Sequence, residues 1–288
     1  MKKLLILALI GVLFMVGCST DDPYAGISEN DSAVVTVDGH SYTRGQFYDA
    51  LVSTNATALV TNKLVDMMYE NVIGDESVIL DQVNEILEQL KAGDESYFKL
   101  YLSYMGYTSE ETYVNDMILF SKQDALVGKY IEDNYDQFIT DYQPKMVRML
   151  QTSDKDKAEE ALALIKDGAS FLETTTTYGN GNYNGQTQLI HNESENVSSN
   201  VLLAIQSYDE ATILDAVVVN TEGTLFTVIE ITDVDSTSLK DEFVSSLKQI
   251  DEVIDTAITS YVRAGNFTVF DKNVYDALNK TNPNFLDQ

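Results

Sequence analysis

The sequence predicts an α+β fold in which helical segments flank a small mixed module. Apolar residues follow helical spacing through most of the chain before Pro144, and the same spacing returns in a long amphipathic stretch that begins at Leu239. Between these segments, one helical pattern and three short apolar runs bounded by turn residues are typical of a small α+β unit. The amphipathic stretch needs a partner for its apolar face, and the helices before Pro144 supply one.

The first elements expected are a short strand, a tight turn and a series of helices. Val34–Val37 is the strand, Asp38-Gly39 is the turn, and Thr43 is the N-cap of a helix that ends near Val52. Further helices are expected over Leu59–Val72, Ser77–Lys91, a segment with Tyr97, Leu100 and Tyr104 that stops at Gly106, and Thr108–Tyr130. Thr108 and Glu111 have the spacing of a capping box.

The middle and the end of the chain are expected to alternate between strands and helices. Val147–Leu150 is a strand, and Lys155–Lys166 is a helix that Gly168 ends. Four residues of that helix are expected to face inward: Ala158, Ala161, Leu162 and Ile165. Thr174–Asn200 is polar and predicts no regular element. The remaining expected elements are a short helix at Val201–Tyr208, strands at Ala216–Val219 and Leu225–Ile231, one helix from Leu239 to Gly265, and a closing strand at Phe267–Phe270.

The N-terminus has the pattern of an export signal. Lys2 and Lys3 precede the apolar run Leu4–Val16, which is short for a permanent membrane span, and Gly17-Cys18 follows. This ending resembles a lipobox, which implies cleavage before Cys18 and lipid attachment to its thiol. The expected division is a signal peptide at 1–17 and a flexible polar tether at 18–32. The chain would then lie on the extracellular face of the cell membrane, anchored by lipid; an ordinary cleaved signal with an incidental cysteine is the alternative.

Composition excludes several classes of function. The 46 Asp and Glu against 18 Lys and Arg give a formal net charge of −28, so the chain repels phosphate backbones and nucleic acid binding is not expected. Cys18 is the only cysteine, and neither His40 nor His191 has a partner at ligand spacing. We therefore expect no metal and no cofactor, and we expect both histidines to be surface or turn residues.

Three motifs together resemble the PrsA-type foldase lipoproteins and, more distantly, the SurA-like chaperones. They are Val34–Gly39 with Tyr42-Thr43 and Gln46-Phe47, then Gly106–Glu111, then Lys155–Phe171. The resemblance implies a helical chaperone lobe formed by 33–143 and 236–288. It implies a parvulin-like α+β domain, a peptidyl-prolyl isomerase module, inserted at 144–235.

The parvulin resemblance does not extend to the catalytic histidines. In that family two histidines lie on adjacent central strands, and the matching positions here hold Met149 or Arg148 on the first strand and Thr227 on the second. His191 falls on neither strand. We therefore assign no catalytic residue and expect a module with weak or no isomerase activity.

The resemblance implies a membrane-anchored chaperone that holds unfolded or folding secreted proteins. The apolar and aromatic residues of the lobe either line a groove for these clients or pack in its core: Tyr97, Phe98, Tyr101, Tyr104, Met105 and Tyr107. An active peptidyl-prolyl isomerase is the main alternative, and a lipid-anchored solute-binding protein is a distant one. The resemblance also leaves open a homodimer formed through the helical lobe.

Overall fold

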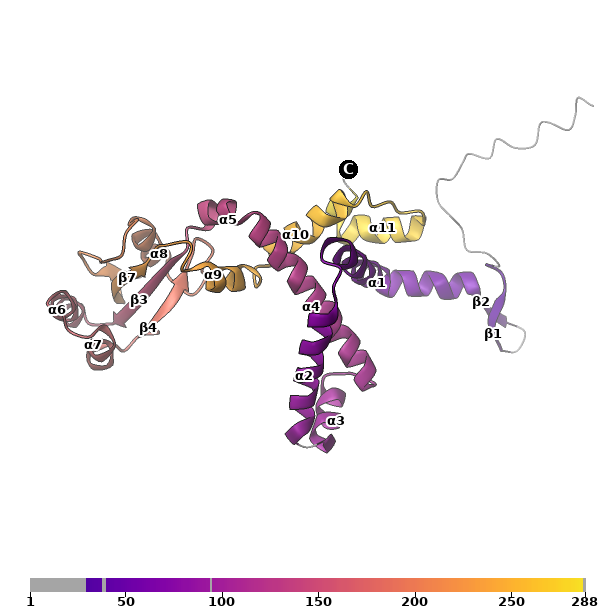
Figure 1. Cartoon of the computed structure of the whole chain (residues 1–288), viewed down its shortest axis with the longest axis horizontal. Helices are drawn as coiled ribbons and strands as arrows, with labels where there is room; N and C mark the ends of the chain where they lie inside the picture. The colour runs from indigo at the N-terminus through magenta and orange to yellow at the C-terminus, as the bar shows by residue number, and fades with distance from the viewer. Residues whose placement is uncertain (1–29, 38–39, 94, 287–288) are drawn as a thin grey trace, which may run out of the picture. The chain divides into compact units, whose positions relative to one another are not determined.

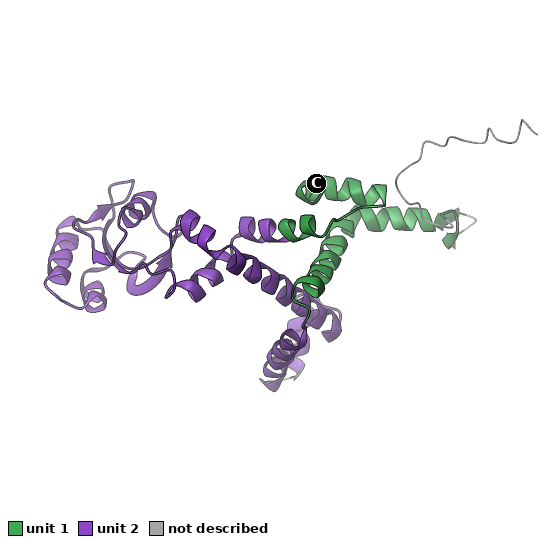
Figure 2. Cartoon of the chain, turned by 45° about the horizontal axis from the view of Figure 1, so that its top comes forward, with its two compact units in different colours: residues 1–74, 259–288 green, residues 75–258 purple. Residues whose placement is uncertain are grey.

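The computed structural model describes residues 30–37, 40–93 and 95–286, and over these ranges it has the expected α+β fold (Figure 1). The chain divides into two compact units, residues 1–74 with 259–288 and residues 75–258 (Figure 2). Cys18 and the predicted Asp38-Gly39 turn lie outside the described residues.

The first unit begins with a hairpin that leads into a long helix. Strand β1 (Ala33–Val37) pairs antiparallel with β2 (His40–Thr43), and α1 (Arg44–Val72) follows directly. Thr43 is the N-cap, as predicted. Its hydroxyl accepts from the Gln46 backbone N–H (3.3 Å), and the Gln46 side chain accepts from the Thr43 N–H (2.9 Å). This reciprocal pair is a capping box, so two of the unpaired amides at the start of α1 are satisfied.

Helix α1 is continuous, so the prediction of separate helices ending near Val52 and beginning at Leu59 was wrong. The polar residues between them are helical, and the hydroxyls of two of them bond to a carbonyl of the preceding turn. Ser53 Oγ donates to the Ala50 carbonyl at 2.9 Å, and Thr54 Oγ1 donates to the same carbonyl at 2.8 Å. Such back-bonding satisfies a short polar side chain inside a helix, which the residue pattern alone does not reveal.

The strand expected at Phe267–Phe270 is absent, so that prediction was wrong, and a helix that was not predicted follows it. Residues 267–270 have no regular structure, and α11 (Lys272–Thr281) follows, with a 3₁₀ turn at Pro283–Phe285. Asp271 caps α11 by accepting from the Val274 N–H at 3.0 Å. Leu278 is fully buried, and α11 packs against α1. The apolar stripe of α11 is narrow, which is why periodicity did not predict it.

The second unit contains the remaining helices outside the module. They are α2 (Ser77–Gly93), α3 (Glu95–Tyr104), α4 (Glu110–Asp133), α5 (Tyr135–Tyr142), α9 (Lys240–Leu247) and the first part of α10 (Asp251–Ala264). The N-cap of α4 is Ser109, whose Oγ accepts from the Thr112 N–H at 3.2 Å, and not Thr108 as predicted. Helix α5 was not predicted.

The long helix predicted from Leu239 to Gly265 is interrupted, so that prediction was also wrong. At the break, the amides of Gln249 and Ile250 bond to carbonyls three residues back, at 3.1 Å each, rather than four. Lys248 Nζ donates to Asp124 Oδ2 of α4 at 2.8 Å, which holds the break in place. The apolar spacing continues across the break, so the pattern could not distinguish one helix from two.

Residues 144–235 hold a five-stranded antiparallel sheet and three helices. The strands are β3 (Lys145–Thr152), β4 (Asn184–Ile190), β5 (Thr212–Ile213), β6 (Val218–Val219) and β7 (Phe226–Asp233); the helices are α6 (Lys155–Lys166), α7 (Phe171–Tyr178) and α8 (Ser199–Gln206). The order is β4-β3-β7-β5, and β6 also pairs with β7. Strands β4 and β5 and helix α7 were not predicted.

The sheet separates two apolar clusters because side chains alternate along its strands. Leu150 and Val228 pack with the inward residues of α6 and with Phe171 of α7. Met149 and Ile229 belong to a second cluster that includes residues of α8. All four residues of α6 that were expected to face inward are buried, which confirms that prediction.

Candidate functional site

The first candidate site lies on the two central strands of the sheet, β3 and β7. Thr227 of β7 pairs with Gln151 of β3, whereas Met149 pairs with Ile229. Gln151 Nε2 donates to Thr227 Oγ1 at 3.3 Å. Sequence reasoning identified Thr227 but missed Gln151, since its role depends on strand register.

Gln151 fastens the loop after α7 to the sheet. Its backbone carbonyl accepts from the N–H groups of Asn180 (2.9 Å) and Gly181 (3.0 Å), and its Oε1 accepts from the Asn182 N–H (3.4 Å). A Cβ at Gly181 would lie 2.5 Å from the same Oε1, so the glycine permits this close approach. The amide of Gln151 therefore fills the space beside Thr227 with internal hydrogen bonds.

These positions cannot do acid–base chemistry on a bound peptide. Met149 and Thr227 have no exposed surface, and Gln151 is 4% exposed. None of the three side chains titrates near neutral pH. Arg148 lies on the opposite face, where its Nε donates to Thr187 Oγ1 (3.2 Å) and its Nη1 lies 3.5 Å from Glu230 Oε2. Its contacts join β4, β3 and β7 and are structural.

Of the two positions expected for His191, surface or turn, the structure shows the turn that follows β4, and the side chain there is buried. Its ring lies 5.7 Å from that of Tyr142 and 6.1 Å from that of Phe243, between centroids. Its Nδ1 accepts from the Glu193 backbone N–H at 3.2 Å, which fixes that nitrogen as unprotonated. Burial lowers the pKa of His191, and the nearby Glu193 carboxylate opposes this only in part. His40 is exposed, as expected.

The buried His191 predicts a loss of stability in mild acid. The unfolded chain takes up a proton near the ordinary histidine pKa, about 6.5, while the folded chain resists protonation. The free energy of unfolding therefore falls as the pH drops through this value. His191→Gln should reduce the fall in the free energy of unfolding between about pH 7.5 and about pH 5.5. Urea unfolding at the two pH values measures this fall. His40→Gln is the control, and an equal loss in wild type and His191→Gln would contradict the prediction.

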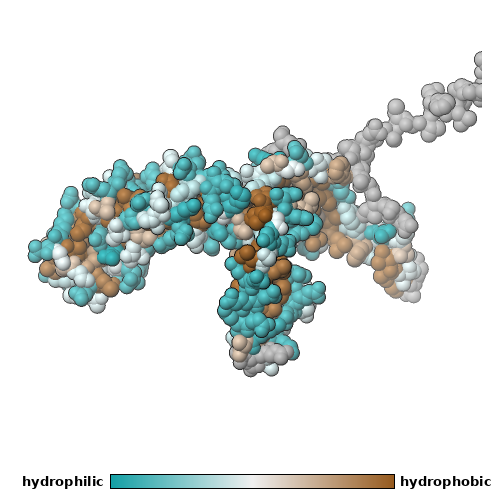
Figure 3. All heavy atoms as spheres, viewed as in Figure 1, coloured by the Kyte–Doolittle hydropathy of each residue, from teal (hydrophilic) through white to brown (hydrophobic). Residues whose placement is uncertain are grey.

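The apolar and aromatic residues near α3 divide into a packed set and an exposed set. Phe98 is 2% exposed and packs with Leu87 and Leu102, while Tyr101 and Tyr107 are half-buried against Tyr113. Tyr97, Tyr104 and Met105 are exposed. Figure 3 shows apolar residues at the surface along α2–α4. Core packing thus accounts for one part of the cluster, and the other part remains accessible.

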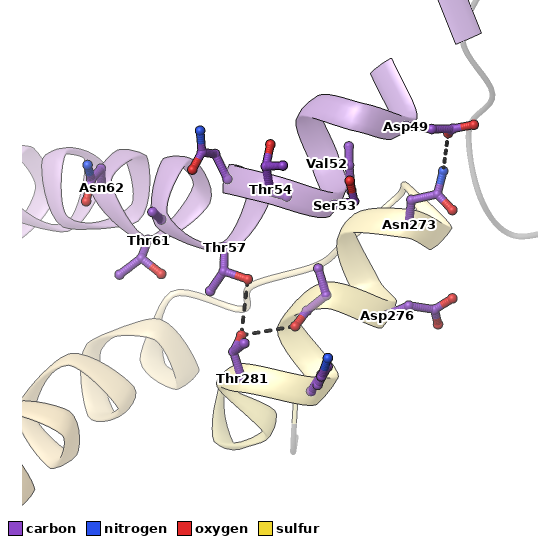
Figure 4. Close-up of a pocket in the computed structure, with 15 residues that line it drawn as sticks. Asp49, Val52, Ser53, Thr54, Thr57, Thr61, Asn62, Asn273, Asp276 and Thr281 are labelled. Atoms are coloured by element: carbon purple, nitrogen blue, oxygen red, sulfur yellow. Dashed lines mark hydrogen bonds between the residues drawn. The ribbon is translucent and has the colours of Figure 1, made fainter. Parts of the chain in front are cut away.

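A groove in the first unit lies between α1 and α11 (Figure 4). It has a volume of about 930 Å³. Most of its lining is small or polar: Asp49, Val52, Ser53, Thr54, Asn55, Ala56, Thr57, Ala58, Thr61, Asn62, Asn273, Asp276, Ala277, Lys280 and Thr281. Thr57 and Thr281 share a hydroxyl hydrogen bond of 3.1 Å, and Asn273 Nδ2 donates to Asp49 Oδ1 at 3.1 Å. These bonds link α1 to α11 across the groove.

Neither a metal cluster nor a membrane span occurs in the part of the chain that the structure describes. No three His, Cys, Asp or Glu residues there are grouped to hold a metal ion. None of the helices there is long and apolar enough to cross a membrane.

Comparison with known proteins identifies PrsA foldases among the relatives. No family model matches the chain. Foldase protein PrsA of Streptococcus agalactiae is 25% identical over 263 residues, which cover 85% of this chain and 81% of the relative. Foldase protein PrsA 2 of Listeria innocua is 25% identical over 187 residues, 62% of this chain and 59% of the relative. The solved structure of PrsA from Streptococcus pneumoniae aligns with a TM-score of 0.47 at 17% identity, over 86% of this chain and 98% of that chain. The chain is thus similar in sequence to PrsA foldases over most of its length.

Proposed function

We propose that the chain is an extracytoplasmic foldase that acts as a chaperone for secreted proteins, held at the outer face of the membrane by a lipid on Cys18. The homology to PrsA foldases over 85% of the chain supports this function. The proposal retains the predicted division into a helical lobe, 33–143 with 236–288, and a parvulin-like domain at 144–235.

The observation that carries the proposal is the uneven exposure of large apolar side chains. Among the described residues, fourteen such side chains are exposed between residues 44 and 133, but only three between residues 144 and 235, a stretch of similar length. Exposed apolar surface on a soluble protein body generally marks an interaction site. The helices therefore offer surface for unfolded clients, and the module does not.

Isomerase activity of the module is proposed to be weak or absent. Prolyl isomerisation must overcome a rotational barrier of about 18–20 kcal/mol, and catalysis requires a pocket that holds the imide in its twisted form. Thr227 and Met149 are fully buried, and Gln151 is bonded to the neighbouring loop. A proline peptide can therefore reach neither Met149 nor Thr227 without rearrangement of the sheet.

The test is aggregation suppression by the full chain in lipid nanodiscs. Reduced lysozyme and reduced α-lactalbumin are suitable clients because they share a fold and differ in the sign of their charge. Light scattering from at least one of them should fall in the presence of the chain and not with empty nanodiscs. Isomerisation of a proline peptide, measured on the same preparation, should stay near the uncatalysed rate. No suppression at several-fold excess would refute the chaperone proposal, and fast isomerisation would establish the enzyme instead.

A further inference from the structure

Helix α3 is apolar on two faces, of which only one is buried. Phe98 and Leu102 are 2% and 6% exposed. On the other face, Tyr97 is 69% exposed, Leu100 is 66% exposed and Tyr104 is 87% exposed. The spacing of three and then four residues puts these three side chains in one row along the helix. Met105, 53% exposed, follows at its end. We call these four residues the α3 stripe.

The buried face fixes the orientation of the stripe. The Phe98 and Tyr101 rings each meet the Tyr113 ring of α4 edge to face, with centroids 6.2 and 6.1 Å apart. Phe98 also packs with Leu87 of α2. Turning the stripe inward would expose this cluster to water, at a cost of about 1.5–3 kcal/mol for each large side chain. The stripe is thus held toward solvent.

A groove of about 620 Å³ lies on the other side of α3. Its lining includes Phe98, Lys99 and Leu102 of α3 and Glu110 at the start of α4, and none of the four stripe residues. The stripe itself is therefore the apolar surface that α3 offers to a partner.

The charge around the stripe favours a basic partner. Residues 75–116 contain ten Asp or Glu and two Lys. One of these lysines, Lys91, already pairs with Glu110, Nζ to Oε1, at 2.6 Å. The field of such a surface attracts Lys and Arg side chains and repels acidic ones.

The area and the charge argue against a second copy of the chain as the occupant. Four large side chains at these exposures present on the order of 500 Å², at about 200 Å² for each full side chain. A stable interface buries about 800 Å² from each partner. Two chains that each carry a net charge of −28 also repel one another. A short, transiently bound segment suits this surface better.

We propose that the α3 stripe binds segments of unfolded secreted proteins in which apolar residues are flanked by Lys or Arg. The proposal rests on the chaperone function and specifies its substrate class. Apolar side chains of the client cover the stripe. The basic flanks are held by the surrounding carboxylates, so that binding weakens as salt screens them.

The direct test is fluorescence anisotropy with the full chain in lipid nanodiscs. The probe is a short labelled peptide of Phe, Leu and Lys, and the same peptide with Glu in place of Lys is its control. The triple variant Tyr97→Ser, Leu100→Ser, Tyr104→Ser should weaken binding of the basic peptide by about tenfold or more. The matched variant Leu164→Ser, Leu172→Ser, Leu203→Ser removes three exposed leucines of the module and should bind like wild type.

The outcomes distinguish a failure of this proposal from a failure of the chaperone function. If wild type suppresses lysozyme aggregation and the α3 triple variant binds and suppresses equally well, the stripe is not the site and the chaperone function stands. Equal binding of the Glu peptide overturns the basic preference. A change in particle mass on mutation shows that the stripe binds a second copy. If the triple variant unfolds, a photoreactive residue at position 104 should still cross-link the basic peptide, and the same residue at position 203 should not. If the peptide cross-links at neither position, the proposal is overturned.

Discussion

Phe243→Ala is expected to lower the free energy of unfolding of the second unit by about 3–5 kcal/mol. Phe243 is fully buried on α9, and its ring meets those of Tyr135, Tyr142 and His191 at centroid distances of 6.2, 6.2 and 6.1 Å. These partners come from α5 and from the turn after β4. The substitution therefore leaves a cavity where the helices meet the sheet domain.

The measurement is urea unfolding of the full chain followed by circular dichroism, with hydrogen exchange of β3 and α9 as a local readout. Phe120→Ala is the matched control, because Phe120 lies on α4 in the same unit and is 71% exposed. Its effect should stay within about 0.5 kcal/mol. Equal effects of the two substitutions would show that the aromatic cluster does not hold this junction together.

Gly185→Ala is expected to destabilise the sheet domain by about 3 kcal/mol, the sum of backbone strain and overpacking. Gly185 has φ = +76°, and a Cβ there would lie 2.5 Å from Thr175 Oγ1 and 2.9 Å from Thr175 Cβ. Thr175 is buried, and its hydroxyl donates to the Phe171 carbonyl at 2.8 Å, so it cannot rotate away without losing that bond.

Gly223→Ala separates the two contributions. Gly223 has φ = +72°, but a Cβ there meets nothing within 4 Å. The Gly223→Ala substitution should therefore cost only the backbone strain of a positive φ, about 1–2 kcal/mol. Urea unfolding of both variants gives the steric contribution as their difference. A Gly185→Ala variant no less stable than Gly223→Ala would mean that α7 and β4 are not packed as closely as the structure has them.

Elements with strong local signals were predictable, and those that depend on partners were not. The helix Lys155–Lys166 combines an apolar stripe with a terminal glycine, and the structure has the same bounds. Strand β4 is polar and exists because β3 supplies its hydrogen bonds and Gly185 allows its approach to α7. Helix α11 has few apolar residues and packs on α1. For both, the stabilising contacts lie far away in sequence.

The sequence by itself determined the α+β class and the resemblance to PrsA foldases, and it predicts that the parvulin histidines are absent, because these follow from local patterns and residue identities. Only the tertiary structure decided that Gln151 pairs with Thr227, that His191 is buried, and that one face of α3 stays exposed while the other packs. Register and burial depend on which distant segments meet. A helix with apolar residues on both faces cannot indicate, from its own sequence, which face finds a partner.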